Sequence, residues 1–375
     1  MISPQRFFDI LKNNGITFFT GVPDSLLKDF CAYITDNVPK KDHIINSNEG
    51  AAVALASGHY IASGSPALVY MQNSGLGNAV NPLLSLADPE VYSIPLLMLI
   101  GWRGEPGKKD EPQHIKQGKV MLDILNAMKI PYEIINSLSE NIEEITGKIF
   151  SSIKELSSPA AIIISEGTFE EYKSVNERKT EYELNREEAI KIILNELGEN
   201  EVIVSTTGKA SREVYEYRKN NNQGHQNDFL TVGSMGHSSQ IALGIALEKK
   251  NKQVYVLDGD GAVIMHMGSL AILGNEAPEN FRHILINNGA HDSVGGQPTA
   301  GFNTDFSTIA KACGYKISIT SDTEKQIRES VSILKKNPGP SFLEIRVNKG
   351  ARKDLGRPAT SPAENRISLM ENLSK

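Results

Sequence analysis

Short hydrophobic runs alternate with longer amphipathic segments along most of the chain. In the first half we predict strands at 16–19, 44–45, 67–71, 95–100, 132–135 and 160–164, and helices at 4–11, 24–33, 51–61, 79–86, 119–128 and 142–156. Residues 96–100 and 161–164 are apolar throughout, which is typical of parallel strands covered on both faces.

The alternation stops at 167–184, which is rich in Glu, Lys, Tyr and Ser and has no apolar period, so we predict a linker there. It resumes at Asn185, a suitable N-cap for a helix at 187–197. Further strands are predicted at 202–205, 229–232, 253–257, 283–287, 315–319 and 341–347. The sequence therefore predicts an α/β protein with two open parallel-sheet domains in tandem, 1–166 and 185–375. Such sheets bind ligands at the carboxyl ends of their strands.

Composition narrows the class of protein. The 375 residues have room for two ordinary domains, and 39% hydrophobic residues supply their cores. A formal net charge of −6 argues against nucleic-acid binding but leaves an anionic small substrate open, since a pocket sets its own potential. The start of the chain lacks a signal-peptide pattern, and no stretch of about 18 apolar residues occurs, so we expect a soluble, cytoplasmic protein.

The two cysteines, Cys31 and Cys313, both lie in apolar segments that look helical. We interpret them as buried structural thiols, with a disulfide or a catalytic thiol as the less favoured alternative.

A glycine-rich turn with two aspartates follows the predicted strand at 253–257. Its sequence is Asp258-Gly259-Asp260-Gly261-Ala262, and a helix comes next. Glycines and a helix N-terminus favour an oxyanion such as a diphosphate, and Mg²⁺ would bridge that group to the aspartate. Asn287-Asn288 ends the next strand and offers neutral oxygen ligands. A purely structural turn remains the alternative; a dinucleotide fingerprint does not fit, because Ile264 stands where its third glycine belongs.

These motifs together resemble the thiamine-diphosphate-dependent enzymes. The resemblance implies that Asp260, Asn288 and the carbonyl of Ala290 hold Mg²⁺ or another divalent cation. It also implies that the second half, 185–375, is the diphosphate-binding domain. The implied contacts to thiamine diphosphate are Thr207, Gly208, Ser234, Met235, Gly236, Gly259, Asp260, Gly261, Ala262 and Asn288.

The same family uses a glutamate, followed by a run of alanines, to activate the pyrimidine ring of the cofactor. Glu49, in Glu49-Gly50-Ala51-Ala52, matches that pattern. By itself it would be interpreted as a first-turn glutamate that complements the helix dipole. The resemblance implies that 1–166 is the pyrimidine-binding domain and that the partner subunit supplies it. The active unit would then be a homodimer or larger, with a shared active site.

The predicted linker is too short to hold the third domain of many relatives. Within the family the first half resembles decarboxylases that act on phosphonopyruvate, and next those that act on sulfopyruvate. In the first half the resemblance rests on the segments 71–78, 100–107 and 110–114, and in the second half 289–298 and 350–358 support the same match. It implies decarboxylation of 3-phosphonopyruvate to phosphonoacetaldehyde. A carboligase, and a regulatory protein that binds the cofactor without turnover, are weaker alternatives.

An anionic substrate tail needs donors beyond those that neutralise the cofactor, and Arg is the best fork for its oxygens. For single lysines a solvated surface position is the better interpretation. The candidates lie in two glycine-containing stretches, at 103–114 and 350–358, which we predict to be loops. The predicted substrate-binding residues are Arg103, Lys109, Gln113 and Arg352.

Four residues are candidates for proton transfer. Asp24 matches the place where related decarboxylases carry an acid–base residue, although a helix N-cap is an equal alternative. His114 lies beside the predicted substrate residues. His291 and, more weakly, His59 could also take this role, and either could be a structural histidine.

Overall fold

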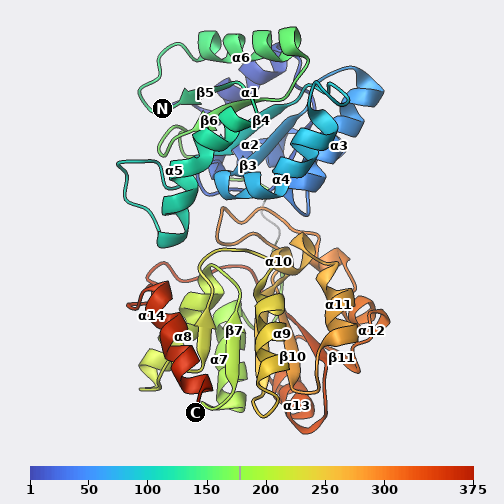
Figure 1. Cartoon of the computed structure of the whole chain (residues 1–375), viewed down its shortest axis with the longest axis vertical. Coiled ribbons are helices and arrows are strands. Elements are labelled where there is room, and N and C mark those ends of the chain that lie inside the picture. Colours follow the sequence, from blue (N-terminus) through green and yellow to red (C-terminus); the bar gives the residue numbers. More distant parts are fainter. Residues whose placement is uncertain (177–178) are drawn as a thin grey trace. The chain divides into compact units, whose positions relative to one another are not determined.

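The computed structural model describes residues 1–176 and 179–375. The chain forms two compact units, Met1–Glu177 and Arg178–Lys375. Each unit contains one six-stranded sheet in which every paired strand is parallel, with helices packed on its faces (Figure 1). The predicted architecture, two tandem α/β units with open parallel sheets, is confirmed.

The sheet of the first unit has the strand order β2-β1-β3-β4-β6-β5. Its strands are β1 (Phe19–Gly21), β2 (His43–Ile45), β3 (Leu68–Gln72), β4 (Leu97–Gly101), β5 (Tyr132–Ile135) and β6 (Ala160–Ile164). The helices are α1 (Pro4–Asn13), α2 (Lys28–Asn37), α3 (Glu49–Ser63), α4 (Leu76–Pro82), α5 (Pro112–Ala127) and α6 (Ile142–Leu156), with short helical turns η1 (Asn73–Gly75) and η2 (Leu83–Ala87).

The sheet of the second unit has the order β11-β12-β10-β9-β7-β8. Its strands are β7 (Val202–Ser205), β8 (Asp228–Leu230), β9 (Val254–Gly259), β10 (Phe281–Asn287), β11 (Ile317–Ser321) and β12 (Ser341–Arg346). The helices are α7 (Arg186–Leu197), α8 (Lys209–Asn220), α9 (Ser238–Glu248), α10 (Asp260–Met265), α11 (Ser269–Glu276), α12 (Phe306–Ala312), α13 (Glu324–Lys336) and α14 (Pro362–Leu373), with one turn η3 (Gly301–Asn303).

Each sheet separates two hydrophobic clusters, because successive strand residues point to opposite faces. In β4, Leu97 and Leu99 join one cluster, while Met98 and Ile100 join the other. Strand β9 divides in the same way, with Val254 and Val256 on one side and Tyr255 and Leu257 on the other. This two-sided burial explains why the central strands are apolar throughout.

Several local predictions need correction. Helix α2 begins at Lys28, not at Asp24. Strand β1 begins at Phe19, not Ile16, because its pairing with β2 starts at Phe19 opposite His43. Helix α5 begins at Pro112, so Gln113 and His114 lie in its first turn and not in a loop. Cys31 is buried as predicted, but Cys313 is partly exposed because it caps the short helix α12.

Helix α14 was not predicted as a separate element. It begins with a capping box, in which Ser361 accepts from the backbone N–H of Glu364 and the Glu364 carboxylate accepts in return. The Ser-Pro-x-Glu pattern was a readable signal for it.

The predicted linker, 167–184, makes hydrogen bonds on both sides of residues 177 and 178, which lie outside the described residues. Before them, the N–H of Tyr172 donates to Asp29 and that of Val175 to Asp36. After them, the N–H of Tyr182 donates to the Asn348 side chain.

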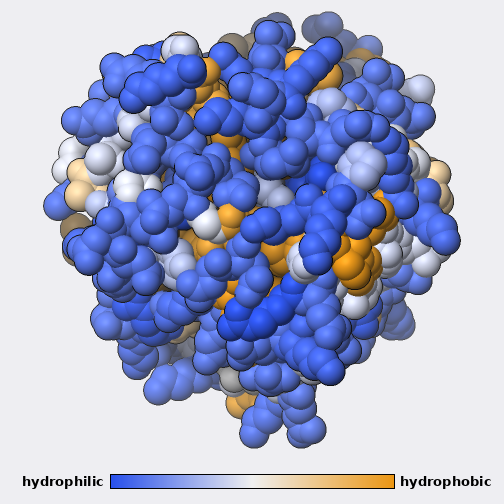
Figure 2. All heavy atoms as spheres, turned by 90° about the horizontal axis from the view of Figure 1, so that it is seen from below, coloured by the Kyte–Doolittle hydropathy of each residue, from blue (hydrophilic) through white to orange (hydrophobic). Residues whose placement is uncertain are grey.

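Within 1–176 and 179–375, no helix is both long enough and apolar enough to span a membrane. The face of the molecule in Figure 2 is predominantly hydrophilic, and its hydrophobic atoms form separate small patches.

A buried ion pair joins helix α8 to the edge strand β8. Arg218 and Asp228 are 1% and 0% exposed, and two guanidinium nitrogens each donate to a carboxylate oxygen at 3.2 Å. Arg218→Met would leave the buried Asp228 carboxylate without its arginine, with only the His225 ring 3.8 Å away, so we expect a loss of about 3–5 kcal/mol in the free energy of unfolding. Urea denaturation measures it. Arg6→Met is the control: it breaks the exposed Arg6–Glu143 pair and should cost less than about 1 kcal/mol. Equal losses from both variants would contradict this account.

Candidate active site

The carboxyl ends of β9 and β10 bring Asp260 and Asn288 together. The two strands are paired neighbours, with Ile286 opposite Gly259. Asp260 begins helix α10, and the backbone N–H of Asn288 donates to its Oδ1 at 3.4 Å. The connection from β9 through α10 and α11 to β10 therefore positions both residues.

Asp260 is a buried carboxylate with neutral partners. Its side chain is 2% exposed and accepts from the Thr299 hydroxyl as well as from Asn288. Both of these partners are neutral groups. Burial raises the pKa of Asp260 to about 6, against the lowering effect of these hydrogen bonds. A buried carboxylate of this kind calls for a cation, and oxygen ligands suit Mg²⁺.

The two adjacent asparagines differ in their surroundings. Asn287 is fully buried, donates to the Gly301 carbonyl and the Glu344 carboxylate, and accepts from the N–H of Gly289. Asn288 donates to Asp292, while its Oδ1 accepts from the N–H of Ala290. Asn287 is therefore committed to the fold, and Asn288 carries the amide oxygen suited to a cation. The described residues contain no group of three or more His, Cys, Asp or Glu placed to hold a metal, and the predicted ligand set has a single carboxylate.

Close backbone approaches join the glycine-containing loops of the second unit. A Cβ on Gly208, which follows β7 and has φ +92°, would lie 2.7 Å from the Ser293 hydroxyl. A Cβ on Gly236, with φ +84°, would lie 2.9 Å from the Ala262 carbonyl. Thr207 precedes the first of these glycines, and the turn at 234–236 follows β8. The structure thus brings these predicted cofactor residues to one edge of the sheet.

Two more predicted residues face Gly261. A Cβ there would lie 3.0 Å from the ring of His291 and 3.2 Å from the methyl carbon of Met235. Burial lowers the pKa of His291 to about 4, so its imidazole is neutral at pH 7.

In the first unit, Glu49 is buried at the start of helix α3. It is 4% exposed, and Asn78 Nδ2 donates to its Oε2 at 2.8 Å. Gly75 makes room for the carboxylate, since a Cβ there would lie 2.2 Å from Oε1. Burial raises the pKa of Glu49. A glutamate that served only the helix dipole would not need this burial.

Asp24 is fully buried at the carboxyl end of β1. It accepts from Gln72 Nε2 at 2.7 Å and from the N–H of Leu26 at 2.9 Å. Burial raises its pKa against the lowering effect of these bonds. The N-cap of α2 is Leu27, so Asp24 does not cap that helix.

Arg103 follows β4 and is already paired. Its Nε and Nη2 donate to Asp110, its Nη1 donates to Ser25 at 2.7 Å, and Asn73 bonds its backbone. The Asp110 side chain therefore offsets the charge of Arg103 and fixes its direction.

Three other predicted residues follow Arg103 in the chain. In the described residues, Gln113 Oε1 and His114 Nδ1 are buried without a hydrogen-bond partner. Burial, and after it the charge of Arg103, lowers the pKa of His114. Lys109 is exposed.

His59 packs against an aromatic residue of the same unit. Its ring stacks on Phe18, with centroids 4.5 Å apart, which is a structural role.

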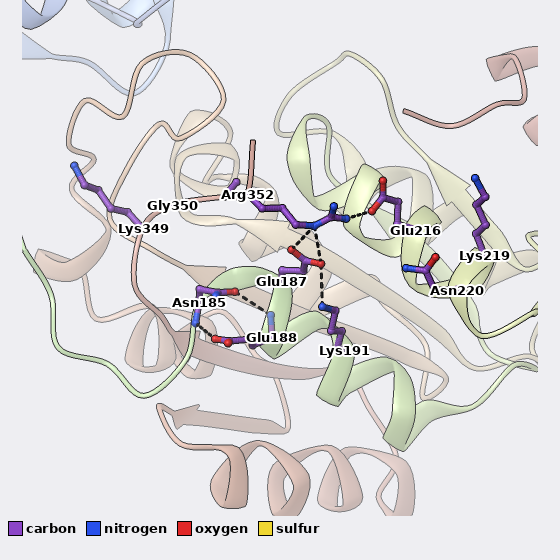
Figure 3. A pocket seen from close by; sticks show the side chains of 11 residues that line it. Asn185, Glu187, Glu188, Lys191, Glu216, Lys219, Asn220, Lys349, Gly350 and Arg352 are labelled. Carbon is purple, nitrogen blue, oxygen red and sulfur yellow. Dashed lines mark hydrogen bonds and ion pairs between the residues drawn. The ribbon is translucent and has the colours of Figure 1, made fainter. Parts of the chain in front are cut away.

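Arg352 lies in a polar pocket of about 730 Å³ lined by α7, α8 and residues 349–352 (Figure 3). It forms ion pairs with Glu187, Glu216 and Asp354. None of the other predicted site residues lines this pocket. Three carboxylates therefore offset the positive charge of Arg352.

Sequence reasoning missed the polar residues that hold these side chains in place: Gln72, Asn78, Asp292 and Thr299. Each is an ordinary polar residue beside a motif, and only the fold shows which side chain it contacts.

Similarity to known proteins identifies the family to which the chain belongs. Residues 4–127 match the thiamine pyrophosphate enzyme N-terminal TPP binding domain, and residues 206–345 match the corresponding C-terminal TPP binding domain. The chain belongs to the thiamine pyrophosphate enzyme family.

Its relatives narrow the class further. The chain is 32% identical to phosphonopyruvate decarboxylase of Streptomyces viridochromogenes, across 93% of this chain and 89% of that protein. It is 30% identical to phosphonopyruvate decarboxylase of Streptomyces hygroscopicus, across 97% and 92%. Sulfopyruvate decarboxylase of Methanosarcina acetivorans is 28% identical, across 93% and 92%. The chain is a carboxy-lyase that uses thiamine diphosphate.

The buried Glu49 carboxylate makes stability depend on pH. Because burial raises its pKa, the folded chain binds this proton more tightly than the unfolded chain. The stability that Glu49 contributes is therefore present below its usual pKa of 4.5 and is lost as the pH rises. Without cofactor, Glu49→Gln should melt at a higher temperature than wild type at about pH 8, with the difference shrinking toward pH 4.5. Thermal unfolding across this range measures it, and a difference that does not change with pH would refute it.

Proposed function

We propose that the chain catalyses the non-oxidative decarboxylation of 3-phosphonopyruvate to phosphonoacetaldehyde and CO₂, with thiamine diphosphate and Mg²⁺, in phosphonate biosynthesis. The observation that supports this choice of substrate is the match to two phosphonopyruvate decarboxylases, at 32% and 30% identity over 93% and 97% of the chain. Decarboxylation of a pyruvate analogue is the reaction that these relatives share with the sulfopyruvate enzyme.

Asp260, Asn288 and the carbonyl of Ala290 would hold the Mg²⁺ against the diphosphate. The support for this assignment is the burial of Asp260 among neutral partners and the orientation of the Asn288 amide oxygen. The glycines in the loops after β7, β8 and β9 allow other groups to approach the backbone closely, which binding of a diphosphate requires.

When bound, thiamine diphosphate supplies the electron sink that lets the carbon–carbon bond between the carboxylate and the keto carbon break. Glu49 would hold the proton that it shares with the pyrimidine ring at Oε1, because Oε2 is occupied by Asn78. Asp24 would return a proton to the carbon that CO₂ leaves, and its raised pKa suits a proton donor. His114 and His291 are the further candidates for this transfer.

Arg103, Gln113 and His114 would bind the phosphonate group. The exposed Lys109 would add a positive charge nearby. The support is the fixed direction of Arg103 and the two buried, unpartnered atoms in the first turn of α5. Arg352 is less suited to this role, because three carboxylates match its charge.

The same proposal covers the assembly. Residues 1–166 would bind the pyrimidine and 185–375 the diphosphate, with 167–184 as the linker. The active unit would be a homodimer or larger in the cytoplasm, with the active site shared between subunits. The support is the family resemblance of both halves.

Decarboxylation of sulfopyruvate is the second candidate. The observation that favours it is the 28% identity to the Methanosarcina enzyme across 93% of this chain. The two substrates differ in the charge and the central atom of the tail.

A direct assay separates the substrates. With thiamine diphosphate and Mg²⁺, the protein should release aldehyde from phosphonopyruvate at least about tenfold faster, in kcat/KM, than from sulfopyruvate or pyruvate. Faster turnover of sulfopyruvate would favour the second candidate. Turnover of none of the three would contradict both.

The Glu49→Ala substitution tests the proposed role of Glu49 in sharing a proton with the pyrimidine ring. It should reduce turnover to background and leave thiamine diphosphate binding, measured by calorimetry, within about threefold of wild type. Asp42→Ala, close by in the sequence, is the matched control and should keep full activity. An active Glu49→Ala enzyme would refute the assignment.

A further inference from the structure

Asp292, four residues after Asn288, joins three segments through a single oxygen. Its Oδ2 accepts from Asn288 Nδ2 at 3.0 Å, from Arg186 Nη1 at 2.9 Å and from the N–H of Gly350 at 2.9 Å. Lys209 Nζ also donates to its backbone carbonyl at 3.0 Å. Helices α7 and α8 and the segment after β12 therefore meet at this residue.

Arg186, which contacts Asp292, also forms a buried ion pair with Glu213. Arg186 and Glu213 are 7% and 2% exposed. Arg186 Nε and Nη2 donate to the two oxygens of Glu213 at 2.8 and 2.9 Å, which leaves Nη1 to face Asp292. The planar guanidinium thus fixes the place of both carboxylates.

This arrangement determines which way the Asn288 amide points. An ionised carboxylate only accepts hydrogen bonds, so the NH₂ end of the amide must face Asp292. The amide oxygen then points the other way, toward the N–H of Ala290 at 3.1 Å. A flipped amide would place its oxygen against the carboxylate and lose both bonds.

We propose that Asp292 is a positioning residue that holds the Asn288 amide oxygen toward the divalent cation, and that the Arg186–Glu213 pair holds Asp292. The proposal rests on the proposed function, which makes Asn288 a cation ligand. Residues that orient a metal ligand typically change metal affinity by about 10–100-fold when removed.

Mn²⁺ binding in the presence of thiamine diphosphate, followed by the EPR signal of the free ion, tests this without turnover. Asp292→Ala removes the acceptor and should weaken Mn²⁺ affinity at least about tenfold. Asp292→Asn keeps an acceptor oxygen and should weaken it less than about threefold. Asp354→Ala also removes a carboxylate paired with an arginine, on an 81% exposed side chain, and should leave the affinity unchanged.

Three results would overturn the proposal. Asp292→Ala within about twofold of wild type would show that Asn288 needs no positioning, while leaving the proposed function intact. Equal loss in the Asn and Ala variants would assign the effect to charge and not to orientation. Wild-type protein without Mn²⁺ binding would remove the proposed function as well. If Asp292→Ala does not fold by circular dichroism, Asp292→Ser, too short to reach Asn288, carries the same tenfold expectation.

Discussion

The structure depends on buried carboxylates whose hydrogen bonds come from neutral groups. Asp24, Glu49 and Asp260 are at most 4% exposed, and their hydrogen bonds in the described residues come from amides, backbone N–H groups and a hydroxyl. Burial raises the pKa of each. Burying a carboxylate in this way costs free energy that an apolar residue would not. We propose that these three carboxylates, at the carboxyl ends of the two sheets, receive a ligand that supplies a charge or a proton.

Parallel sheets make this arrangement possible. Their strands end at one edge, so residues distant in sequence meet there, as Asp24 meets Gln72 and Asp260 meets Asn288. The two hydrophobic clusters of each sheet hold the strands in register, and glycines such as Gly75 and Gly261 let neighbouring side chains pack closely against the backbone. The Arg186–Glu213 pair adds a rigid support behind Asp292. Rigid strands and buried ion pairs thus position the side chains on which the chemistry rests.

The sequence predicted the architecture well, because strands such as β4 and β9 are buried on both faces and show it in their composition. It also singled out Glu49, Asp260 and Asn288, which lie inside short motifs. It could not show that Arg103 forms an ion pair with Asp110, or that Arg352 forms ion pairs with three carboxylates, since these contacts depend on tertiary packing. It likewise placed Gln113 and His114 in a loop, because the proline that begins α5 sits in a stretch rich in turn residues.

The proposed chemistry depends on a divalent cation that would be bound by Asp260 and would in turn bind thiamine diphosphate. Calorimetric titration of thiamine diphosphate into wild-type protein and Asp260→Asn, each with Mg²⁺ and with a chelator, tests it most directly. Mg²⁺ should strengthen the binding of thiamine diphosphate at least about tenfold in the wild-type protein and should have no effect in the variant. Equal affinity of the wild-type protein with Mg²⁺ and with the chelator would contradict it.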